Sequence, residues 1–121
     1  MICGVHAFIG ATLGKALKSK SRAFLAGVIT HFFLDLTPHR DFSVPTETVL
    51  ALTALAVIGS SQGWNSPAFW GALGGVVPDI ENAISQVRGG GRPLFPSHND
   101  RLHGPKVKEI VSQAAILLVC L

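Results

Sequence analysis

Residues 30–42 read THFFLDLTPHRDF and bring the polar and the apolar character of this chain together. Two histidines, two aspartates and an arginine stand here beside three consecutive apolar residues. Pro38 should end or kink the preceding helix, because proline lacks an amide donor and clashes with the previous turn. An ionisable group in apolar surroundings is costly unless it is paired or bound to a metal ion. The stretch therefore predicts an apolar helix that ends at a polar functional site.

The chain as a whole is apolar and carries few charges. Its 121 residues suit one domain and are too few for two ordinary ones. Charged residues make up 14%, against roughly 25% in soluble domains, and the mean hydropathy is +0.43. We expect a membrane-embedded protein, with a small and very apolar helical bundle as the alternative. The basic residues behind the net charge of +3 are scattered among few aromatic residues, which argues against nucleic-acid binding.

Helical periodicity and turn signals predict an all-α fold, a compact bundle of about five short helices in one domain. The basic run KSKSR ends the first helix, and the turn GSSQGWNSP separates the third helix from the fourth. A loop rich in glycine and proline, residues 88–104, precedes the last helix. The expected helices span residues 2–17, 22–36, 45–60, 66–87 and 105–121.

Two features favour a membrane location over a buried core. The spacings Gly10-xxx-Gly14 and Gly71-xxx-Gly75 let helix backbones approach closely, and two tryptophans flank a loop where interfacial aromatics would sit. The apolar runs are shorter than the roughly 20 residues that span a bilayer, a length at which core helices compete. We expect membrane lipid as a partner, and the apolar faces would also support a homo-oligomer.

If the first four helices run alternately up and down, most ionisable residues reach the same end of the bundle. The metal ligands predicted at this end are His6, His31, Asp35, His39, Asp79 and His98. His31 and Asp35 are four residues apart on one helical face, so both can point to one centre. Imidazole and carboxylate ligands suit zinc, or manganese or iron where carboxylates dominate. The alternative is that His31 and Asp35 only hydrogen-bond each other in the core.

The segment PDIEN, residues 78–82, carries two further acidic groups. Proline in a first helical turn leaves free amides nearby, so Asp79 either caps a half-helix or turns inward as a ligand. Glu81 is a candidate ligand or general base, or it faces solvent.

These motifs resemble a known family. HAFIG at 6–10, HFFLDLTPHR at 31–40 and GALGGVVPDIEN at 71–82 are similar to small bacterial membrane-bound metal-dependent hydrolases, themselves distantly similar to zinc-dependent phospholipase C. The resemblance implies a place in the bacterial inner membrane. The ligands implied by the family pattern are His6, Asp79 and His39, and those implied by the phospholipase-like pattern are His31, Asp35 and His39. Glu81 and Asn82 stand where the family has Asp and His, so one metal ion is expected rather than a cluster.

The leading hypothesis is a metal-dependent hydrolase that cleaves a phosphoester, such as that of a lipid, at the membrane surface. The metal would activate a water molecule and polarise the phosphoryl oxygen. Arg40 or Arg101 would hold the anionic group, and Glu81 or Asp41 would take the proton. The alternative is a helical membrane protein without catalysis that binds metal or self-associates.

Overall fold

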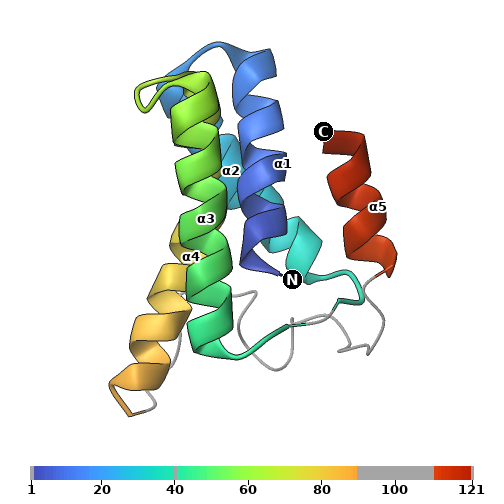
Figure 1. Cartoon of the computed structure of the whole chain (residues 1–121), viewed down its shortest axis with the longest axis vertical. Coiled ribbons are helices and arrows are strands. Elements are labelled where there is room, and N and C mark those ends of the chain that lie inside the picture. The colour runs from blue at the N-terminus through green and yellow to red at the C-terminus, as the bar shows by residue number, and fades with distance from the viewer. Residues whose placement is uncertain (1, 40, 90–110, 121) are drawn as a thin grey trace.

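The computed structural model describes residues 2–39, 41–89 and 111–120, and within them the chain forms five helices (Figure 1). They are α1 (Cys3–Leu17), α2 (Lys20–Asp35), α3 (Val44–Gln62), α4 (Pro67–Val87) and α5 (Val111–Cys120). The first four run alternately up and down, so the start of α1, the end of α2 and the second half of α4 share one end (Figure 1). The predicted all-α bundle is confirmed.

The helix ends follow from local chemistry. Ser66 precedes α4, and its side chain accepts a hydrogen bond from the Phe69 amide, which satisfies one unpaired donor of the first turn. Lys18 closes α1 and Gly63 closes α3, both with positive φ angles. The first four helices begin and end within two residues of the predicted positions, whereas the predicted start of the last helix, at 105, lies outside the described residues.

Helices α1, α2 and α4 pack with their backbones almost in contact. A Cβ atom on Gly10 of α1 would overlap the carbonyl oxygen of Gly71 in α4, and a Cβ atom on Gly71 would overlap the carbonyl of Gly10. Alanines fill much of the space around them, among them the fully buried Ala7 and Ala72. This close approach brings side chains of three helices within reach of one another.

Helix α3 is the one helix of the described chain that is long and apolar enough to cross a membrane, with a mean hydropathy of 1.4 over its best window. Only 22% of that window is buried in the bundle. Val49, Leu52 and Val57 all lie exposed on its surface. Helix α1 is apolar as well, but it is shorter than a bilayer requires.

Candidate metal centre

His31, near the end of α2, is completely buried, and a neighbouring carbonyl fixes its tautomer. Its Nδ1 lies 2.8 Å from the carbonyl oxygen of Gly75 in α4. A carbonyl oxygen only accepts, so Nδ1 carries a proton and donates it to Gly75, which leaves Nε2 to face the carboxylates. Nε2 lies 3.0 Å from Oδ2 of Asp35 and 3.8 Å from Oδ1 of Asp79. Such a backbone bond to one nitrogen is how proteins orient a metal-binding histidine.

His6, in the second turn of α1, lies against His31 with its ring stacked on the other, the centroids 4.0 Å apart. Burial, and next the neighbouring His31, lower the pKa of His6 to about 4, so the ring is neutral at neutral pH. Its Nε2 lies 3.1 Å from Oδ1 of Asp35. With the proton on Nε2, the buried Nδ1 keeps a lone pair that has no hydrogen-bond partner in the described part of the chain. A metal ion would satisfy such an atom.

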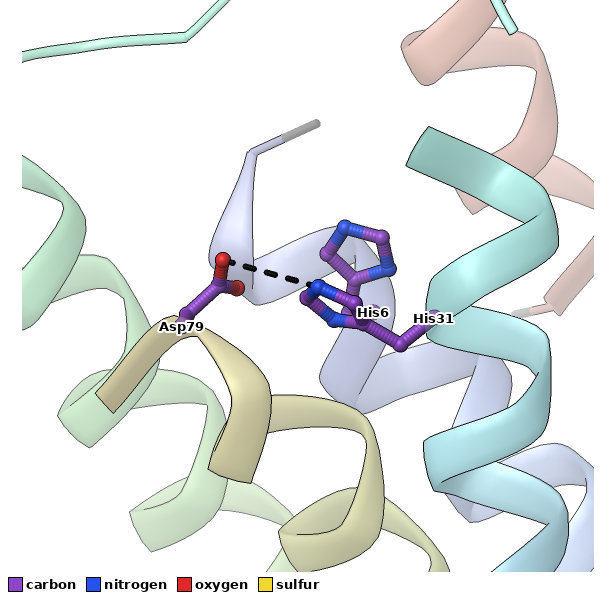
Figure 2. Close-up of side chains that lie close together, drawn as sticks. All are labelled: His6, His31 and Asp79. Carbon is purple, nitrogen blue, oxygen red and sulfur yellow. Dashed lines mark ion pairs between the residues drawn. The ribbon is translucent and has the colours of Figure 1, made fainter. Parts of the chain in front are cut away.

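Asp79 reaches the two histidines from α4, and its carboxylate faces the stacked rings (Figure 2). Helix α4 continues through Pro78, so Asp79 lies inside the helix and does not cap a new one. Of the two fates predicted for this residue, the inward orientation is the one found. The Asp79 side chain is 21% exposed, so the centre is partly open to solvent on the side of α4.

His6, His31 and Asp79 together form a group that could hold a metal ion. Each offers one ligand atom, and these three atoms all lie within 4.8 Å of one another. Two imidazoles and a carboxylate are a ligand set that zinc uses in catalytic sites, where the fourth position is left for water or substrate. Asp35, itself buried, accepts a hydrogen bond from Nε2 of His6, and its other oxygen lies 3.0 Å from Nε2 of His31. The residues present therefore fit a single divalent ion.

His39 and Asp41 lie outside that three-residue group and form a pair of their own. His39 is buried, with Nδ1 at 2.7 Å from the Thr37 carbonyl oxygen and Nε2 at 3.2 Å from Oδ1 of Asp41. Burial by itself raises the pKa of Asp41, but hydrogen bonds, the one with His39 foremost, outweigh it and hold this pKa well below the usual range. Asp41 is therefore a weak base.

The other predicted site residues fall in two classes. Glu81 is half-buried on α4, two residues beyond Asp79, and residues so spaced do not share a helical face. Arg40 and His98 lie outside the described residues.

Two residues near the centre were not singled out by sequence reasoning. Gly75 entered only as one member of a packing pair, although its carbonyl accepts from His31 and a Cβ there would overlap the His6 carbonyl. Cys3 showed no motif, yet burial raises the pKa of its thiol well above its ordinary value, and the nearby Asp79 carboxylate raises it further. Only their positions in the sequence point to these two residues. Cys3 lies about one helical turn before the predicted ligand His6, and Gly75 lies about one turn before Asp79.

Comparisons with known proteins do not assign a family. No model of a protein family, no curated protein and no solved structure matches the chain. The chemistry of the centre therefore rests on its own residues and geometry.

Proposed function

We propose that the protein is a membrane-associated hydrolase that uses one divalent metal ion, zinc first of all, to cleave a phosphoester. The observation that supports this proposal is the meeting of His6, His31 and Asp79 at one end of an apolar bundle. The resemblance of the motifs to membrane-bound metal-dependent hydrolases points to the same activity.

We assign two roles to residues of the chain: some would bind the ion, and others would orient those ligands. His6, His31 and Asp79 would hold the ion, and Asp35 would orient the His6 ring. When bound, such an ion lowers the pKa of water and polarises a phosphoryl oxygen. The Gly75 carbonyl keeps the His31 proton on Nδ1, and thereby keeps Nε2 available as a donor of its lone pair.

A proton acceptor is proposed from the carboxylates outside the metal group. A carboxylate with a depressed pKa is a poor base, which disfavours Asp41 because of its bond to His39. Glu81 is the other candidate and is proposed from the sequence pattern, although it faces a different side of α4 from Asp79, and Arg40 is proposed to bind the anionic group of the substrate.

Exposed apolar side chains support the proposed membrane location. The side chains of α3 are mostly exposed, and large apolar residues are also exposed on neighbouring helices. The exposed residues of α2 and α5 include Leu25, Ile29, Phe33, Leu118 and Val119. Soluble monomers rarely expose so much apolar surface, whereas a lipid environment accommodates it. We infer a bacterial inner-membrane protein whose metal centre lies near the membrane surface.

Two matched histidine variants test the metal centre. His31 and His39 are both buried, and each bonds a backbone carbonyl through Nδ1, but only His31 belongs to the three-residue group. Protein purified in detergent, without chelator or an affinity tag of histidines, should contain about one metal ion per chain by elemental analysis. His31→Gln should lose that ion and His39→Gln should keep it.

The outcomes separate the hypotheses. Wild-type protein without metal would exclude the metal centre and leave a self-associating helical protein. Loss of metal from both variants would mean that His39 shares the site. Metal at full occupancy without cleavage of a chromogenic phosphodiester or of phospholipid vesicles would favour the non-catalytic metal-binding alternative.

A further inference from the structure

A cavity of about 350 Å³ lies between α1, α3 and α5, beside the metal centre but separate from it. Helix α1 packs against both other helices and has α3 on one side and α5 on the other (Figure 1). The side chains around the cavity are almost all apolar, and they include Val5, Phe8, Leu50, Ala54, Val57 and Leu117. The volume lies at the lower end of the range for ligand pockets, roughly 300–1,000 Å³.

The few polar side chains of the cavity wall are already engaged. The Thr53 hydroxyl donates to the Val49 carbonyl oxygen at 2.7 Å, and Oε1 of Gln113 accepts from the Ile2 amide at 2.8 Å. A cavity with apolar walls holds hydrocarbon readily and water poorly, because water there finds too few hydrogen-bond partners. The occupant that fits this chemistry is therefore apolar.

The cavity and the metal centre lie on different faces of the first turns of α1. Val5 lines the cavity, and the next residue, His6, belongs to the metal group. Phe42 lines the cavity on another side and is held against α1 by Glu47. The Glu47 carboxylate accepts from the Phe42 amide at 2.9 Å and from the Cys3 amide at 2.7 Å. The cavity and the metal centre both reach the end of the bundle where α1 begins, so the head group of a lipid bound in the cavity would lie at the same end as the proposed ion.

The cavity is also continuous with exposed apolar surface. Val57 both lines it and is half exposed, on the same helix as the exposed Val49 and Leu52. On α5, Leu117 lines the cavity and is followed by the exposed Leu118 and Val119. Among the described residues, these exposed apolar side chains of α3 and α5 offer a hydrocarbon chain in a bilayer a way into the cavity. A helix about 10 Å across is too wide for this volume, which disfavours a second protein chain.

We propose that this cavity binds one hydrocarbon chain of a membrane lipid, whose phosphate group then lies at the metal centre. The placement of the phosphate rests on the proposed function; the binding of the chain does not. Apolar contact with the cavity wall supplies the affinity, and the first turns of α1 separate the chain from the metal centre. The substrate class would thus be a lipid phosphoester rather than a soluble ester.

The test uses a phosphatidylglycerol analogue that carries a photoreactive diazirine in one acyl chain, mixed into detergent micelles with the full protein. After irradiation, mass spectrometry should find the label on cavity residues of α1, α3 and α5. Gly4→Leu fills the cavity without a backbone clash, since a Cβ there meets only ordinary contacts at 3.7 Å and beyond. Ala54→Leu fills it from α3 and serves as the second variant. Thr12→Leu adds the same side chain on the exposed side of α1.

Both filled variants should lower cavity labelling at least about tenfold, because the added side chain takes the place of several methylene groups. Thr12→Leu should label like the wild type. His31→Gln should also keep the label, so a failure of the metal centre is distinguishable from a failure of the cavity. Labelling spread evenly over exposed helix surfaces and unchanged by filling would overturn the proposal.

Discussion

A single added methyl group at Gly75 should weaken metal binding while the protein stays folded. Its carbonyl oxygen accepts the Nδ1 proton of His31, 2.8 Å away, while its lack of a side chain lets the His6 carbonyl approach α4. In Gly75→Ala the new Cβ would overlap that carbonyl, so α1 and α4 must move apart at this level. The displacement acts on His6, on the hydrogen bond to His31 and on Asp79 one turn further along.

The expected magnitudes follow from opposing effects. Overpacking costs about 1–3 kcal/mol, whereas alanine stabilises a helix by about 1 kcal/mol relative to glycine. The net loss in the free energy of unfolding should therefore be about 0–2 kcal/mol. Disturbing the partner that orients a ligand typically lowers metal affinity about 10–100-fold. Gly75→Ala should thus weaken zinc binding by this factor in protein that is still folded.

Gly71→Ala is the matched control. It lies one turn earlier in α4 and would overlap the carbonyl of Gly10 in α1, but no hydrogen bond joins it to either histidine. Zinc affinity is measured by competition with a chromogenic chelator, and stability by thermal unfolding followed with circular dichroism. We expect Gly71→Ala to lose a similar amount of stability and to bind zinc like the wild type. Equal zinc affinity in the two variants would refute the role assigned to Gly75.

Two further predictions concern the carboxylates. Asp35→Asn removes the carboxylate charge from the acceptor of the His6 Nε2 proton, so zinc affinity should fall about 10–100-fold with helical content unchanged; wild-type affinity in the chelator assay would contradict an orienting role for Asp35. The pKa of Asp41 lies below its ordinary value of 3.8, so its pairing with His39 stabilises the fold above that pH and is lost as the pH falls. Thermal unfolding midpoints should therefore drop more steeply below about pH 4 in wild type than in Asp41→Asn; parallel curves would exclude this linkage.

The meeting of the polar residues was predictable because it depends on helix direction and spacing alone. Short turns between the first four helices impose an up-and-down order, which puts the start of one helix beside the end of the next. His31 and Asp35 share a face because they are four residues apart. His6 and Asp79 then fall at the same level as this pair, and the structure brings all four within contact of their neighbours.

The direction of individual side chains was not predictable in the same way. His39 follows the end of α2, where the backbone no longer repeats a helical geometry, so its pairing with Asp41 depends on a turn that spacing rules do not fix. Whether Asp79 caps or ligates depended on whether Pro78 starts a helix or is absorbed by one. The tautomer of His31 depends on a backbone carbonyl from another helix, and no pattern in the sequence reports such a contact.

The glycines explain why fold and site depend on each other in this chain. Each glycine inside a helix costs about 1 kcal/mol relative to alanine, yet α1 and α4 place Gly10, Gly71 and Gly75 where the two helices touch. With larger residues the helices would lie further apart, and short side chains such as Asp79 could not reach a partner on the next helix. Buried polar groups left unpaired would then destabilise the bundle more than the glycines do. The close packing is therefore a requirement of the polar centre, and a substitution that widens this contact should loosen the ion before it unfolds the chain.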